Sequence, residues 1–173
     1  LEILIKEESS KMQLTLKTIL NFKEKHEHFI YRDVRLANER IEVTIEPRKR
    51  SLGICSGCGD RCAGYDRLPL REFIHVPFWG LQVILLYCMR RVSCKKCGIV
   101  SEQVPWSSGK SPITIGYAWF LSEWAKLLSV QEVARQFKTT WHHVFGGVAM
   151  AVSWGRERLD LKHITALGVD EIY

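Results

Sequence analysis

Two short cysteine pairs limit the folds open to this chain more than any other feature of its sequence. Each pair has the form Cys-x-x-Cys-Gly, 35 residues separate the pairs, and the four positions are Cys55, Cys58, Cys94 and Cys97. Two residues between thiolates let one tight turn direct both sulfurs at the same ion, and the glycine that follows permits a positive φ. Because two such turns complete a tetrahedral shell with Zn–S distances of about 2.3 Å, the pattern predicts one bound zinc ion.

The remaining cysteines and one histidine are weaker ligand candidates. A single Cys-x-x-Cys would also suit a redox centre, but two pairs with strand-like sequence between them favour a metal. Four thiolates leave no open coordination position, so the zinc is expected to be structural rather than catalytic. Cys62, four residues after Cys58, could enter the ligand shell but is expected to be a free thiol beside the site. Cys88 is expected to be a small buried residue of a strand, and His75 lies far from both pairs.

Hydrophobic periodicity divides the chain into a strand-rich part and a helical part. Ile41, Val43 and Ile45 alternate with polar residues, which is typical of a strand, and residues 37–39 supply a turn before them. Strands are expected over residues 29–36, 40–45, 70–76, 81–92 and 167–173. Helices are expected over residues 115–127, 130–137 and 140–158, and residues 14–21 suit either a short helix or an extended segment.

Composition favours a folded chain with an acidic partner. Hydrophobic residues make up 46% of the 173 residues, the formal net charge is +6 and the isoelectric point is about 9.1. A moderate excess of Lys and Arg favours nucleic acid, the commonest acidic partner. The longest apolar stretch, residues 78–89, is too short to span a bilayer, and charged residues interrupt the N-terminal segment where a signal peptide would be apolar. We therefore expect no membrane partner and a cytoplasmic protein, in which cysteines stay reduced.

Basic residues gather around the second cysteine pair. They are Arg90, Arg91, Lys95 and Lys96. Four cations at one metal site suit contacts with DNA phosphates. The alternative is that they only offset the negative charge of the thiolates.

Residues 128–144 have the layout of a helix-turn-helix. Ser129 and Glu132 have the spacing of a capping box, and Thr140 is placed to cap the next helix. Because the exposed start of the second helix enters the major groove in such motifs, the candidate DNA contacts are Thr140, Trp141, His142 and His143. An ordinary helical hairpin shares much of this pattern. Metal binding by the two histidines is not expected because the thiolates already close the shell.

Together these motifs resemble the N-terminal half of an insertion-sequence transposase of the ISL-three family, over nearly all of residues 12–173. The resembling stretches are the two cysteine pairs, Tyr65-Asp66-Arg67, Arg90-Arg91-Val92, Val104-Pro105-Trp106, Trp124-Ala125, Leu128-Ser129, Glu132-Val133-Ala134 and Gly168-Val169-Asp170-Glu171. Residues 1–11 have no counterpart in the family pattern.

The resemblance implies binding of element ends in the nucleoid, a homodimer in the full-length protein, and an RNase-H-like domain with an Asp-Asp-Glu active site. Three carboxylates of that site hold two Mg²⁺ ions for in-line attack on a phosphodiester. Asp170 matches the first of them, and Glu171 would point to the other face of its strand. The second Asp and the Glu are expected beyond residue 173, so the chain is expected to be inactive as a nuclease.

The expected fold class is α+β in several modules: an N-terminal β-hairpin, a four-cysteine zinc ribbon, a helix-turn-helix bundle and the first strand of the RNase-H-like domain. The expected boundaries are 1–11 for an upstream or disordered lead, 12–48 for the hairpin, 49–110 for the ribbon, 111–158 for the helix-turn-helix and 159–173 for the start of the catalytic domain. The main alternative is a transcription regulator with a zinc ribbon and helix-turn-helix, and a further one is a module that binds another protein.

Overall fold

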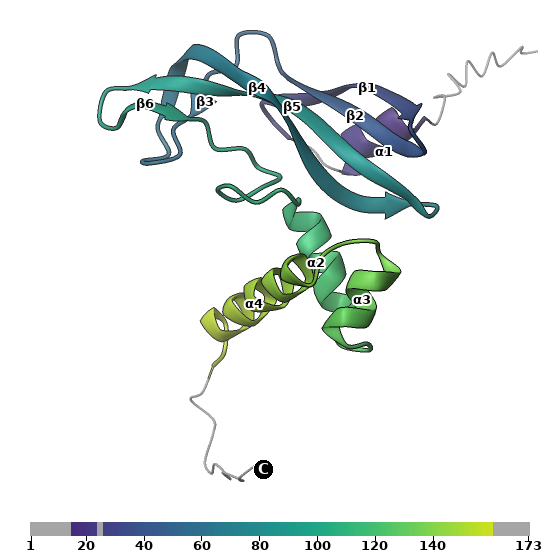
Figure 1. Ribbon diagram of the computed structural model, residues 1–173. Helices are drawn as coiled ribbons and strands as arrows, with labels where there is room; N and C mark the ends of the chain where they lie inside the picture. The colour runs from purple at the N-terminus through teal and green to yellow at the C-terminus, as the bar shows by residue number, and fades with distance from the viewer. Residues whose placement is uncertain (1–14, 24–25, 161–173) are drawn as a thin grey trace, which may run out of the picture. The chain divides into compact units, whose positions relative to one another are not determined.

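The computed structural model describes residues 15–23 and 26–160, which fall into two compact units divided between Thr114 and Ile115 (Figure 1). We call residues 15–114 the sheet unit and residues 115–160 the helical unit. The described residues form six strands and four helices, so the fold is α+β. The strand expected over residues 167–173, with Asp170, lies outside the described residues.

The predicted N-terminal hairpin is present and belongs to a larger sheet. Strands β1 (Phe29–Ala37) and β2 (Arg40–Pro47) pair antiparallel around Asn38 and Glu39, whose φ angles are 51° and 58°. Two consecutive positive φ values match the twist of the flanking strands. Strand β2 then pairs in parallel with β5 (Leu81–Cys94). The hairpin and ribbon regions, predicted as separate modules, therefore share one sheet, because a non-local pairing joins them.

Strand β5 is the centre of the sheet. It pairs with β4 (Arg61–Phe78) along its length, and its other edge pairs with β2 and with β6 (Gly98–Ser101). All residues from Val83 to Tyr87 are buried, and Val83, Leu85 and Tyr87 belong to the core cluster of the sheet unit. Strand β4 begins earlier than predicted. A register shift between Arg67 and Leu70 accommodates Pro69, which cannot donate to a regular ladder.

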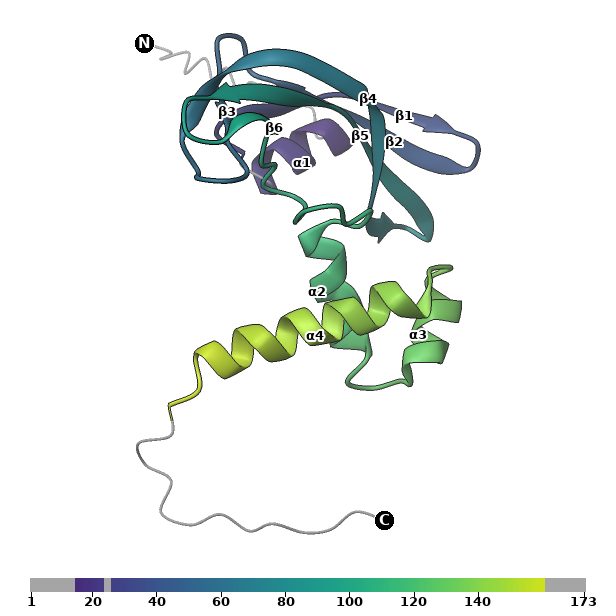
Figure 2. The same ribbon diagram turned by 60° about the vertical axis from the view of Figure 1, so that its left-hand side comes forward.

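The core of the sheet unit is aromatic and lies on one face of the sheet. Trp106, in the segment after β6, packs edge-on against Phe29 and Tyr87, with ring centroids 4.8 and 5.2 Å away. Helix α1 (Leu16–Lys23) contributes Leu20 to the same cluster. Figure 2 shows α1 and the segment after β6 on the same side of the sheet. A short strand, β3 (Gly53–Ile54), pairs with the start of β4 and leads into the first cysteine pair.

The helical unit contains the three predicted helices, with the first one shorter than expected. They are α2 (Ile115–Trp124), α3 (Val130–Gln136) and α4 (Trp141–Glu157). A Cβ atom added at Gly147 would lie 2.5 Å from the carbonyl oxygen of Ala118, whereas one added at Gly146 would meet nothing within 4 Å. Gly147 therefore permits the close approach of α4 to α2. No helix among the described residues is long and apolar enough to cross a membrane.

Candidate metal centre and nucleic-acid interface

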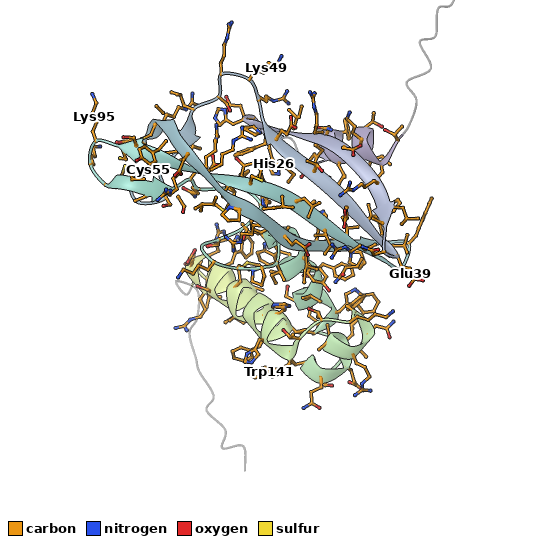
Figure 3. The ribbon with its side chains drawn as sticks, turned by 45° about the horizontal axis from the view of Figure 1, so that its top comes forward. His26, Glu39, Lys49, Cys55, Lys95 and Trp141 are labelled. Atoms are coloured by element: carbon orange, nitrogen blue, oxygen red, sulfur yellow. The ribbon has the colours of Figure 1, made fainter. Side chains whose placement is uncertain are left out.

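The two cysteine pairs meet at one end of the sheet, where Figure 3 labels Cys55. The first pair follows β3, and the second joins β5 to β6. The four sulfur atoms lie within 4.8 Å of one another, and those of Cys58 and Cys94 are 3.5 Å apart. A tetrahedron with metal–sulfur distances of about 2.3 Å has sulfurs about 3.8 Å apart. The four-cysteine cluster therefore has the chemistry and spacing to bind one metal ion.

Glycines shape both turns of the cluster. Gly59 and Gly98 follow the pairs with φ angles of 77° and 75°, as the pattern predicts. Gly57 has a separate role that its position in the sequence does not reveal: a Cβ atom added there would lie 2.9 Å from the sulfur of Cys97. The second position between the first two cysteines must therefore be small for the two pairs to come together.

The electrostatics of the cluster favour a bound cation. Backbone N–H groups of Cys97 and Lys96 lower the pKa of the Cys94 thiol to about 6. A backbone hydrogen bond at Asp60 lowers the pKa of Cys58, but desolvation and the neighbouring cysteines outweigh it and raise that pKa to about 12. Thiols this close oppose one another's ionisation. A bound divalent cation compensates the negative charge of the thiolates and so removes the repulsion that opposes their ionisation.

The other three candidate ligands lie outside the cluster. Cys62 is buried in β4, and its thiol donates to the carbonyl oxygen of Asp60 at 3.5 Å. Cys88 is half-buried in β5. The Nδ1 atom of His75 lies 3.0 Å from the hydroxyl oxygen of Thr114. The metal-ligand group found among the described residues consists of the four predicted cysteines.

Arg90 is not the exposed cation that its sequence context suggests. Its side chain is 10% exposed, and its Nη2 atom lies 2.7 Å from a carboxylate oxygen of Glu102, which is fully buried. Tyr87 also donates its hydroxyl to that carboxylate. Burial by itself lowers the pKa of Arg90, but the hydrogen bond and charge of Glu102 outweigh it and raise that pKa. We correct the expectation of a phosphate contact because this guanidinium neutralises a buried carboxylate.

Of the other three predicted phosphate contacts, Lys95 and Lys96 are exposed and Arg91 is half-buried. Arg91 donates from Nε to Asp66 at 2.7 Å, and the Lys96 ammonium lies 2.9 Å from Asp60. The hydrogen bond from Arg91 lowers the pKa of Asp66. Lys95 extends from the turn of the second pair (Figure 3). Exposed ion pairs contribute only about 0–1 kcal/mol, so Arg91 and Lys96 can exchange their carboxylates for phosphates at little cost.

Local hydrogen bonds define the turn between α3 and α4. The Ser129 and Glu132 side chains form the predicted capping box at the start of α3. At its end, Lys138 has a φ of 49°, and the N–H of Thr139 donates to the carbonyl of Ala134 at 2.9 Å. This pattern is a Schellman motif, with Lys138 in the position that glycine usually takes. Because hydrogen bonds from neighbouring residues satisfy both ends of α3, the turn that follows it has a defined geometry.

The first two turns of α4, where Figure 3 labels Trp141, expose aromatic rings. Trp141 is 52% exposed and Phe145 is 58% exposed, and the ring of His142 stacks on Trp141 with centroids 3.8 Å apart. The side chain of Thr140 accepts from the N–H of His143 and caps the helix. His143 is half-buried, and burial, followed by the charge of His142, lowers its pKa.

Thr140 caps α4 as predicted and is exposed. His143 is less available for contact than expected, because it is half-buried and its Nδ1 atom lies 2.8 Å from the Thr139 hydroxyl oxygen. Phe145 was missed. Its exposure follows from the helix geometry. Val144 is a core residue, and the next position lies about 100° further around the axis, away from the core.

No protein-family model matches the chain, and neither a curated protein nor a solved structure shows significant similarity to it. Its function must therefore be inferred from the arrangement of its own residues.

Proposed function

We propose that this chain binds duplex DNA, with α3 and α4 acting as a helix-turn-helix and α4 as the helix that enters the major groove. The observation that carries the proposal is the exposed start of α4, held by the closed turn after α3. Trp141 and His142 project from that start, while Val133 and Val144 are fully buried beneath it. A fixed turn that presents the first residues of a second helix to solvent is the arrangement by which such motifs reach base edges.

The sheet unit has a supporting function in this proposal. The four-cysteine cluster holds a structural zinc, since a set of four thiolates suits this ion and leaves no position for a substrate. Arg91, Lys95 and Lys96 contact phosphates, which contributes affinity without reading sequence. Arg90 is left out of this surface because it is committed to Glu102.

We further propose that the bound DNA is the end of an insertion sequence and that the chain is the DNA-binding part of its transposase. The support is the combination of the four-cysteine cluster, the helical unit and the Gly-Val-Asp-Glu motif in the order of the ISL-three family. In this proposal Asp170 is the first of three carboxylates that hold Mg²⁺. The metal ions supply charge stabilisation for phosphodiester attack.

Binding of terminal-repeat DNA tests this function. The chain is titrated into a labelled duplex carrying the terminal repeat that flanks the gene, and into a scrambled duplex of equal length, at several salt concentrations. Tighter binding of the repeat is expected, with affinity that falls steeply with salt because phosphate contacts release counterions. Equal binding of both duplexes would count against recognition of element ends, and no binding at low salt would remove the DNA-binding proposal itself.

A further inference from the structure

The exposed start of α4 has an unusual chemistry for a surface that contacts bases. From Trp141 to Gly155 the helix contains no Arg, Lys, Asn, Gln, Asp or Glu. Bidentate recognition of guanine by Arg, or of adenine by Asn or Gln, is therefore not available from these turns. What they do present is the aromatic cluster of Trp141, His142 and Phe145, in which the Trp141 and Phe145 rings meet edge-on at 6.2 Å.

We infer that this aromatic cluster recognises thymine by apolar contact with its C5-methyl group in the major groove, an inference that rests on the proposed DNA binding. The thymine methyl is the one apolar group among the base edges of that groove, and aromatic and small apolar side chains are its usual partners. Trp141 and Phe145 are four residues apart, so their side chains lie on the same face of the helix. Val144 and Gly147 are buried on another face, which fixes the direction in which the two rings point.

The charged residues near the aromatic cluster favour a nucleic acid, rather than an apolar protein surface, as its binding partner. Arg135 and Lys138 are exposed just before α4, and neither forms a salt bridge within the part of the chain that the structure describes. The nearby carboxylate of Glu132 is held by the hydroxyl and N–H of Ser129. The end of α3 and the turn that leads into the aromatic cluster thus carry two exposed cations, which suit the phosphates of a nucleic acid.

Replacement of thymine by uracil tests the inference because it removes only the methyl group. A duplex is first selected by the full chain from a randomised pool and is then resynthesised with deoxyuridine at its thymine positions, singly and together. Affinity is expected to fall about fourfold for each contacted methyl, the value that corresponds to burial of one such group. The Phe145→Ala variant is expected to bind the thymine and uracil duplexes equally.

A matched variant on the same helix supplies the control. Val152 is also exposed, at 54%, but lies about 16 Å along the helix from Trp141, so Val152→Ala is expected to keep the preference for thymine. Equal affinity of the unaltered chain for the two duplexes would overturn the inference while leaving DNA binding intact. If the full chain retained no duplex from the randomised pool, the proposed DNA-binding function would be lost as well. A change of oligomeric state in Phe145→Ala, with an unchanged thymine preference, would assign the cluster to a contact between chains and also overturn the inference.

Discussion

The sheet unit and the helical unit present their chemistry in opposite ways. In the sheet unit the conspicuous cations have carboxylate partners: Arg90 with Glu102, Arg91 with Asp66, and Lys96 with Asp60. In the helical unit the conspicuous exposed groups are aromatic, and Trp141 and Phe145 have more than half of their surface in solvent. The four cysteines and Arg90 thus serve structure, the exposed cations suit phosphates, and the exposed aromatic residues are the better candidates for base contacts.

The two units also differ in how their folds are held. Long-range strand pairing and the four-cysteine cluster organise one end of the sheet unit. The helical unit depends on short-range caps at Ser129 and Thr140 and on one close helix contact at Gly147. A metal is therefore expected to be needed by the sheet unit and not by the helical unit.

The largest effect is expected from loss of the metal. Cys55→Ser and Cys97→Ser should each abolish zinc binding, because three thiolates cannot complete the shell and the binding free energy is part of folding. Metal analysis by mass spectrometry is expected to give one zinc per chain for the unaltered protein and none for these variants. Hydrogen exchange should become fast at the cysteine end of the sheet and stay slow in α4.

Cys62→Ser and Cys88→Ser are the controls for this prediction, since both thiols lie outside the cluster. Both variants should keep one zinc per chain. Zinc retained by Cys55→Ser would contradict the four-cysteine site, and faster hydrogen exchange in α4 on zinc removal would show that the helical unit also depends on the metal.

A smaller effect is expected at two adjacent arginines. Arg90→Met leaves the buried Glu102 carboxylate without its ion partner and should lower the free energy of unfolding by about 3–5 kcal/mol. Arg91→Met removes an exposed pair with Asp66, which solvent screens, and should cost far less. Urea denaturation measures both, and equal losses would mean that Arg90 is not structurally different from its neighbour.

The helical unit offers a matched pair of glycines. Gly147→Ala forces a Cβ against the Ala118 carbonyl and should cost about 1–3 kcal/mol. Gly146→Ala has open space and should stabilise the helix by about 0.8 kcal/mol, since alanine favours helix over glycine. Thermal unfolding followed at α-helical wavelengths checks the opposite signs, and two effects of the same sign would contradict the close packing of α4 on α2.

The smallest effect is expected at the turn before α4. Lys138 adopts a left-handed conformation that costs a side-chain residue about 1–2 kcal/mol. Glycine removes that strain but has more entropy to lose on folding, so Lys138→Gly should stabilise the unit by roughly 0.5 kcal/mol. Urea denaturation of this variant would show a loss of stability instead if the Schellman motif were absent.

Local patterns made much of the fold predictable. The alternation of residues 41–45 predicted the hairpin, the capping residues predicted the starts of α3 and α4, and the cysteine spacing predicted the four-cysteine cluster. Each of these depends on residues near one another in the chain. The parallel pairing of β2 with β5, which joins the hairpin to the ribbon, has no such local signal.

Burial was the part of the site that could not be predicted. Arg90 and Arg91 look alike in the sequence. Their side chains point to opposite faces of β5, and only the fold shows that Glu102 lies beside Arg90 and Asp66 beside Arg91. Gly57 likewise shows its importance only when the second pair, which is distant in the chain, is brought against it.

The division of function between the units is tested most directly by one set of DNA titrations. Terminal-repeat and scrambled duplexes are titrated with Trp141→Ala and with a Lys95→Ala, Lys96→Ala double variant. Trp141→Ala should remove the preference for the terminal repeat. The double variant should weaken binding to both duplexes equally and reduce the dependence of affinity on salt concentration. A preference that survives Trp141→Ala and is lost in the lysine variant would contradict the account.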